Sequence, residues 1–208
     1  MPQTLYIATT NPGKLRDFAT SAAVHGLAIA SLPGISDIPA PIEDGDTFAA
    51  NAHIKAIAYS TFAPGELVIA DDSGLEVDAL AGEPGVRSAR YAEDAGYAGP
   101  MGAGIDERNN LYLLDRLASH QGEKWPARYH CVIAIARNGQ VLLTTDGAVE
   151  GEILKEPRGT GGFGYDPHFY LPQLKQTMAE VDLETRSALS HRGKAFLKLL
   201  EELRRNPL

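Results

Sequence analysis

Two adjacent carboxylates in the middle of the chain offer the most direct chemistry. Asp71 and Asp72 follow the apolar stretch Leu67 to Ala70, which predicts a buried strand that ends at this acidic pair. Ligands of open α/β sheets collect at strand ends, and carboxylate oxygens there suit Mg²⁺. Because successive strand residues point to opposite faces, we expect only one of the two to face a given cleft. In isolation, an Asx-turn or a helix N-cap is the more common role of an Asp-Ser-Gly sequence.

Glu43 and Lys55 could join such a site. Glu43, in the sequence Ile-Glu-Asp-Gly, is a second candidate metal ligand, although by itself it resembles an ordinary acidic loop residue. Lys55 falls within the same narrow arc of a predicted helix as Phe48, Ala52 and Tyr59. A lysine in an apolar stripe either extends along the surface to reach water or directs its ammonium group into a cleft. The second interpretation requires that this helix border the acidic pair.

The turn between the first predicted strand and helix is suited to phosphate. Small hydroxyl residues, a glycine and a lysine stand at a helix N-terminus, where backbone N–H groups and the helix dipole favour anions. The residues of this turn are Thr9, Thr10, Asn11, Pro12, Gly13 and Lys14. The spacing of a Walker loop is absent. The alternative is a tight turn in which Asn11 caps the helix and Pro12 takes its first position.

A glycine-rich segment from Gly159 to Pro167 could approach a nucleotide. Its four glycines let the backbone come close to a ligand, and the rings of Phe163 and Tyr165 could stack on a base. The alternative is a flexible loop that these two rings anchor.

A polar segment from Ser190 to Lys194 opens the last predicted helix. His191 and Arg192, with Arg186 just upstream, could read an anion or a carbonyl oxygen. The alternative is a solvated polar turn.

The elements expected to position these residues alternate between strand and helix. Strands are predicted at residues 4–8, 27–32, 67–70, 128–137 and 140–150, and helices from Leu15 to near Gly26, at 47–62 and 106–120, and after Ser190. Asp46 or Thr47 is expected to cap the second helix, and Asn138-Gly139 predicts a hairpin. Gly82 to Gly104 is expected to be an extended loop. The order predicts an α/β fold with a long, twisted, mixed sheet flanked by helices, in a single domain over residues 1–208.

Composition excludes several classes of protein. The 44% hydrophobic and 22% charged residues are ordinary for a soluble globular chain, and no apolar run reaches the ~20 residues of a membrane span. The net charge of −8 argues against a general nucleic-acid binder. The first residues lack a basic segment followed by an apolar one, so no secretory signal is expected. Cys131 is the single cysteine, which excludes an intramolecular disulfide and favours a cytoplasmic setting.

Taken together and in this order, the motifs resemble those of the inosine triphosphate pyrophosphatase family, which removes non-canonical purine nucleotides. They are Thr-x-Asn-x-x-Lys, Glu-x-Gly-x-Thr-Phe with Asn-Ala-x-x-Lys-Ala, Ala-Asp-Asp-Ser-Gly-Leu, Gly-Gly-Phe-Gly-Tyr-Asp-Pro and Ser-His-Arg-Gly. Each motif alone is weak, but five in register are specific. The resemblance implies Mg²⁺-dependent hydrolysis of ITP, dITP and XTP to the monophosphate and pyrophosphate. It also implies a homodimer, and two lobes with the active-site cleft between them.

The resemblance also implies roles for individual residues. Thr9 to Lys14 and Lys55 would hold the triphosphate. Glu43 and Asp72 would serve the metal, with Asp72 also the general base. The nucleoside would be held by Ser73, Phe163, Gly164, Tyr165, Asp166, His191 and Arg192. Arg186 is a departure, since bacterial members commonly carry lysine there, and a planar fork replaces a point charge.

Two other functions are compatible with the same residues. A Maf-like nucleotide pyrophosphatase would share the general architecture but prefer other bases. A nucleotide-binding sensor would have lost turnover, although the presence of Asp72 and Glu43 speaks against this.

Overall fold

The computed structural model describes residues 4–23, 29–206 and 208, and within them all side chains except those of 17, 21, 23, 187 and 188. One seven-stranded sheet runs in the order β2-β1-β3-β4-β5-β6-β7. β1 pairs in parallel with β2 and β3, whereas β5, β6 and β7 pair antiparallel. The predicted α/β fold with a mixed sheet is therefore confirmed.

The strands are β1 (Leu5–Ile7), β2 (Ile29–Ser31), β3 (Leu67–Val77), β4 (Lys124–Arg137), β5 (Gln140–Leu154), β6 (Phe169–Leu171) and β7 (Gln176–Thr177). The helices are α1 (Pro12–Ala23), α2 (Phe48–Ser60), α3 (Tyr91–Asp94), α4 (Ile105–Leu117), α5 (Leu183–Leu189) and α6 (His191–Arg205). Three 3₁₀ turns are η1 (Ile35–Asp37), η2 (Asp78–Leu80) and η3 (Gly85–Arg90). No helix within the described ranges is long and apolar enough to cross a membrane.

The chain divides into two compact units. The first comprises residues 1–72, 131–148 and 187–208, and the second comprises residues 73–130 and 149–186. The expectation of a single catalytic domain over the whole chain stays a prediction.

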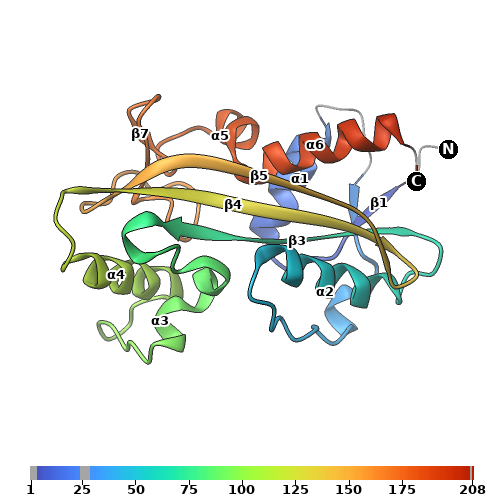
Figure 1. Ribbon diagram of the computed structural model, residues 1–208, viewed down its shortest axis with the longest axis horizontal. Helices are drawn as coiled ribbons and strands as arrows, with labels where there is room; N and C mark the ends of the chain where they lie inside the picture. The colour runs from blue at the N-terminus through green and yellow to red at the C-terminus, as the bar shows by residue number, and fades with distance from the viewer. Residues whose placement is uncertain (1–3, 24–28, 207) are drawn as a thin grey trace. The chain divides into compact units, whose positions relative to one another are not determined.

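The first unit places helices on both faces of its strands. α1 and α6 lie on one face and α2 lies on the other (Figure 1). Phe18 of α1 meets Phe196 of α6 edge to face, with ring centroids 5.7 Å apart, over the buried side chains of Leu67 and Ile69. Because side chains alternate along a strand, the odd-numbered residues of β3 in this unit face α1 and α6, and the even-numbered ones face away from them.

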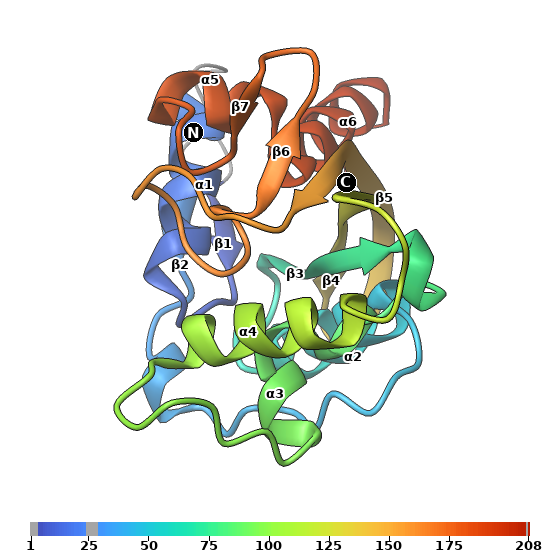
Figure 2. The same cartoon turned by 90° about the vertical axis from the view of Figure 1, so that its left-hand side faces the viewer.

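The second unit has its own apolar core. Tyr129 of β4 packs on Phe169 of β6 with ring centroids 4.3 Å apart, and Leu113 of α4 is fully buried in the same cluster. α3 lies beside α4 (Figure 2), where the backbone N–H of Ala92 donates to Asn109 Oδ1 at 2.9 Å.

Several predicted boundaries agree with the structure. Thr47 is the N-cap of α2 and its side chain accepts from the backbone N–H of Ala50. The hairpin at Asn138-Gly139 is present, with φ of 51° and 78° at these two residues, as its two-residue turn requires. The predicted end of the first helix near Gly26 lies outside the described residues.

Two expectations were wrong. β3 does not end at the acidic pair but continues to Val77, for 11 residues in all, because Leu75 and Val77 are buried in the second unit's core and outweigh the turn preference of Asp-Ser-Gly. The segment Gly82 to Gly104 is not simply an extended loop, since η3 and α3 form within it and bury Tyr91 and Ala92. Strands β6 and β7 and helix α5 were not predicted, because they are too short to show a period.

Candidate active site

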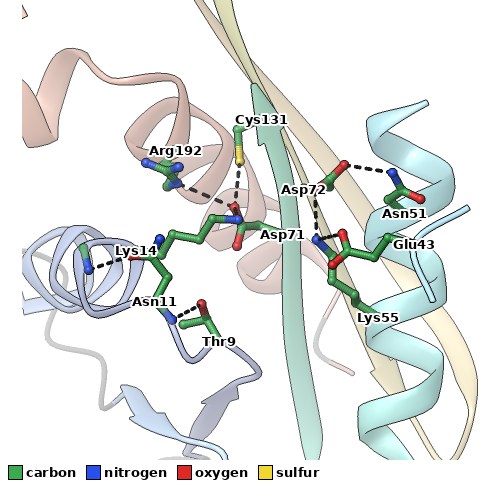
Figure 3. Close-up of polar contacts among 11 residues, drawn as sticks. Thr9, Asn11, Lys14, Glu43, Asn51, Lys55, Asp71, Asp72, Cys131 and Arg192 are labelled. Atoms are coloured by element: carbon green, nitrogen blue, oxygen red, sulfur yellow. Dashed lines mark hydrogen bonds and ion pairs between the residues drawn. The ribbon is translucent and has the colours of Figure 1, made fainter. Parts of the chain in front are cut away.

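The acidic pair of β3 sends its two side chains to opposite faces of the sheet (Figure 3). Asp71 contacts Lys14 of α1 and Arg192 of α6. Asp72 contacts Lys55 and Asn51, which both belong to α2. The expectation that the two carboxylates face different surroundings is therefore confirmed. Strand alternation is the cause, and it holds although the strand continues past the pair.

Lys55 lies between two carboxylates. Its Nζ is 2.9 Å from Asp72 Oδ1 and 2.6 Å from Glu43 Oε2. Only 9% of the residue is exposed, so the lysine does not extend to water along the surface. The condition set by the sequence, that this helix border Asp72, is met. The three residues form a charged cluster on the α2 face, called here the Glu43–Lys55–Asp72 cluster.

Asn51 holds this cluster together and was not singled out from the sequence. Its Nδ2 donates to Asp72 Oδ2 at 3.2 Å, and its Oδ1 accepts from the backbone N–H of Gly45 at 2.9 Å. The loop that carries Glu43 is thereby fixed to α2. A Cβ at Gly45 would come within 2.6 Å of Ala50 Cβ, so only glycine fits this approach. The usable signal was the four-residue separation of Asn51 and Lys55, which places both on one helix face.

Burial and charge shift the pKa values of the cluster. Burial raises the pKa of Asp72, and the neighbouring Lys55 ammonium offsets this only in part. Burial by itself lowers the pKa of Lys55, but the charges of Asp72, Asp71 and Glu43 outweigh it and raise the pKa. A carboxylate with a raised pKa accepts a proton from water more readily than an ordinary one, which suits a general base.

The turn before α1 is a capping turn. Asn11 Oδ1 accepts from the backbone N–H groups of Gly13 at 2.8 Å and Lys14 at 3.2 Å, and Thr9 Oγ1 accepts from the N–H of Asn11. α1 begins at Pro12, so the capping alternative describes the local structure correctly. Lys14 then directs its side chain to Asp71, with Nζ and Oδ2 2.8 Å apart.

The start of α6 is buried rather than solvated. Ser190 caps the helix by accepting from the backbone N–H of Gly193, and His191 and Arg192 are each only 6% exposed. A Cβ at Gly147 of β5 would collide with the backbone of this first turn, so the strand and helix backbones lie in close contact. The solvated-turn alternative is therefore wrong.

The second unit carries the remaining candidates. Tyr165 is buried and its hydroxyl donates to the carbonyl of Ser88 at 2.8 Å, whereas Phe163 is 42% exposed. Asp166 accepts from the backbone N–H of Phe163 and from the hydroxyl of Tyr129. The backbone N–H of Gly164 donates to Asp106 of α4 at 2.8 Å. Phe163 is thus the ring that is exposed enough to stack on a base, whereas the buried ring of Tyr165 anchors the loop.

Two more candidates belong to this unit. Arg186 of α5 lies with its guanidinium against Gly162, next to the carboxylate of Asp166. Ser73 follows Asp72 on β3 and is half-buried.

Comparison with known proteins identifies the family. The sequence profile of the Ham1 family matches residues 5–202. The chain belongs to the Ham1 family. The resemblance stated from the motifs is thereby confirmed.

Several known proteins are similar to the chain over nearly their whole length. The chain is 55% identical to a dITP/XTP pyrophosphatase of Acidobacterium capsulatum, covering 98% of this chain and 99% of the relative. It is 44% identical to a dITP/XTP pyrophosphatase of Thermus thermophilus, covering 97% and 92%. The solved structure of a HAM1 protein from Coxiella burnetii superimposes with a TM-score of 0.82 at 36% identity, covering 98% and 99%.

Glu43 and Asp72, the residues expected to hold a metal, lie close enough together to bind the same cation. Glu43 and Asp72 both contact the Lys55 ammonium, so a single positive charge bridges them. Mg²⁺ in nucleotide enzymes is often held by one or two carboxylates, with water and phosphate oxygens completing its shell. Over the described part of the chain, no group of three or more His, Cys, Asp or Glu side chains gathers as a metal site. The donor set fits a metal shared with the substrate.

Proposed function

We propose that this Ham1 family member hydrolyses non-canonical purine nucleoside triphosphates, namely ITP, dITP and XTP, to the monophosphate and pyrophosphate. The observation that carries the proposal is the Glu43–Lys55–Asp72 cluster, in which a buried general-base candidate lies against a cation and a second carboxylate. It stands in a chain 55% identical to a dITP/XTP pyrophosphatase.

Asp72 is proposed to orient a water molecule and accept its proton. The water oxygen attacks the α-phosphorus in line, the bond from that phosphorus to the α–β bridging oxygen breaks, and pyrophosphate leaves. Asn51 fixes one oxygen of Asp72 and Lys55 the other, so the carboxylate keeps a defined orientation. No covalent intermediate is needed, because water is the nucleophile.

A divalent metal, proposed to be Mg²⁺, would be held by Glu43 and Asp72 together with phosphate oxygens. When bound, it would neutralise charge that develops on the phosphates. Lys55 contacts both carboxylates, and its ammonium is suited to move onto a phosphate oxygen nearby. Lys14 is proposed to bind the outer phosphates, with the turn Thr9 to Gly13 supplying polar groups around them.

A further set of residues is proposed to hold the nucleoside. His191 and Arg192 are assigned to the 6-keto oxygen of hypoxanthine and xanthine, because adenine carries an amino group there and would leave buried donors unpaired. Phe163 is assigned to stack on the base. Ser73, Gly164, Tyr165, Asp166 and Arg186 complete the proposed nucleoside site.

We also propose a cellular location and an oligomeric state for the protein. We assign it to the cytoplasm, because its single cysteine gives no intramolecular disulfide. We propose a homodimer by analogy with the family. Light scattering coupled to size exclusion tests this, and a monomer mass at working concentration would contradict it.

The test of function is a substrate panel with product analysis. ITP, dITP, XTP, GTP, ATP and TTP are each incubated with the protein and Mg²⁺, and pyrophosphate and orthophosphate are measured separately. We expect pyrophosphate from the first three substrates, equimolar with the monophosphate. Preference for other bases would indicate a Maf-like enzyme, and binding without turnover would indicate a sensor; either result contradicts the proposal.

A further inference from the structure

Asp71 is a buried carboxylate to which the proposed reaction assigns no role. Its side chain is only 2% exposed, and its Oδ2 lies 2.8 Å from Lys14 Nζ and 3.6 Å from Arg192 Nε (Figure 3). Cys131 Sγ of β4 is 4.0 Å from the same oxygen. One oxygen thus contacts cations from two different helices, α1 and α6.

The charge on Asp71 is maintained by these cations. Lys14 and Arg192 lie against the buried carboxylate, and their charges offset the cost of keeping it ionised there. Keeping a carboxylate ionised away from water costs free energy unless neighbouring charges and hydrogen bonds compensate it. Two of the cations that compensate Asp71, Lys14 and Arg192, are assigned to opposite ends of the nucleotide.

The two cations would not keep this spacing by themselves. Lys14 has a flexible four-carbon stem and is 18% exposed, so several rotamers are open to it without a fixed acceptor. Lys14 and Arg192 carry like charges and repel each other when no anion stands between them. Asp71 comes from β3 in the interior of the sheet, a rigid element, whereas Lys14 lies in the first turn of α1.

We propose that Asp71 is a positioning residue that sets the distance between the triphosphate-binding and base-binding cations of the site. It accepts from Lys14 and pairs with Arg192, so both side chains are held ready before substrate arrives. The inference rests on the proposed function, because that function assigns Lys14 to phosphate and Arg192 to the base. Asp72, one residue on, faces α2 and takes no part in this arrangement.

The test compares two partial ligands that report the two ends of the site. Tripolyphosphate carries the phosphates without a base, and inosine monophosphate carries the base without outer phosphates. Their dissociation constants are measured calorimetrically with Mg²⁺ present, for wild type, Asp71→Asn, Lys14→Met and Arg192→Met. Asp146→Asn is the matched control, because it removes an exposed carboxylate paired with Lys198 in the same unit.

We expect Asp71→Asn to weaken both partial ligands by at least about threefold and to lower kcat/KM for ITP by at least about tenfold, within the usual range for coupled neighbours. Lys14→Met should weaken tripolyphosphate mainly, and Arg192→Met should weaken the monophosphate mainly. On the Lys14→Met background, Asp71→Asn should have no further effect on tripolyphosphate. The control should bind both ligands as wild type does.

Three outcomes would overturn the proposal. Unchanged dissociation constants with a lower melting temperature would make Asp71 a purely structural residue. Tighter binding of tripolyphosphate by Asp71→Asn would indicate that Asp71 repels the phosphates and does not position Lys14. If Asp71→Asn does not fold, a double-mutant cycle of Lys14→Gln and Arg192→Gln on ITP binding replaces it, and additive effects would contradict the proposal. These binding measurements need no turnover, so they separate failure of this inference from failure of the proposed activity.

Discussion

Replacing Lys55 with methionine should destabilise the protein and make it respond to Mg²⁺. The substitution keeps the apolar stem of the side chain and removes its charge from between Asp72 and Glu43. Asp72 would then be a largely buried carboxylate, 12% exposed, with Asn51 as its remaining described partner on α2. Removing one partner of a buried ion pair costs about 3–5 kcal/mol. Glu43 is 35% exposed, so screening limits its share to about 1 kcal/mol or less.

These values convert into a measurable shift. For a chain of this size, each 1 kcal/mol lowers the melting temperature by about 2–4 °C, so Lys55→Met should melt roughly 6–20 °C below wild type. A metal ion between the two carboxylates would restore part of the lost stability. A ligand whose free concentration is about 100 times its Kd stabilises the folded protein by about 2.7 kcal/mol.

The assay is thermal unfolding at several Mg²⁺ concentrations, for wild type, Lys55→Met and Lys55→Met with Asp72→Asn. Mg²⁺ should raise the melting temperature of the single variant more than that of wild type, because no ammonium competes with it. The double variant should respond weakly. Lys198→Met, which removes an exposed ion pair with Asp146, is the control and should change stability by about 0–1 kcal/mol. A single variant that melts like wild type, or ignores Mg²⁺, would refute the reasoning.

Three further predictions concern Glu43, Arg192 and His168. Glu43→Gln should raise the Mg²⁺ concentration needed for half-maximal activity, and an unchanged metal titration would remove Glu43 from the ligands. Arg192→Ala should lower activity on ITP more than on ATP, and equal losses would place base discrimination elsewhere. Burial lowers the pKa of His168 in the folded protein. As pH falls, the unfolded chain therefore binds a proton at His168 near pH 6.5, whereas the folded chain binds it only at lower pH. The stability of the fold should therefore decrease as pH drops from about 7 to 5. His168→Gln should reduce this dependence of melting temperature on pH, and an identical dependence would contradict the assignment.

The sequence predicted the separation of the two carboxylates better than the length of the strand that carries them. Asp72, Glu43 and Lys55 were each candidates, and strand alternation correctly separated Asp71 from Asp72. The length of β3 was predicted wrongly, because local turn preferences of Asp-Ser-Gly compete with distant apolar partners that a sequence does not display. Only the fold shows that Leu75 and Val77 belong to the core of the second unit.

The partners of each charged group were not predictable in the same way. Nothing in the spacing of Lys14, Asp71 and Arg192 indicates that they meet, because they come from α1, β3 and α6. The buried start of α6 was missed for a related reason. A segment such as Ser-His-Arg-Gly-Lys is polar in composition, and its burial depends on Gly147 of β5, which lets the helix approach.

The measurement that bears most directly on the proposed function is pyrophosphate release from ITP by wild type and Asp72→Asn, with Asp37→Asn in an exposed turn of the same unit as the control. We predict equimolar inosine monophosphate and pyrophosphate from wild type and from the control. Asp72→Asn should lower turnover by at least about 10²-fold, the lower end of what loss of a general base costs. Orthophosphate as the product, or near wild-type turnover by Asp72→Asn, would contradict it.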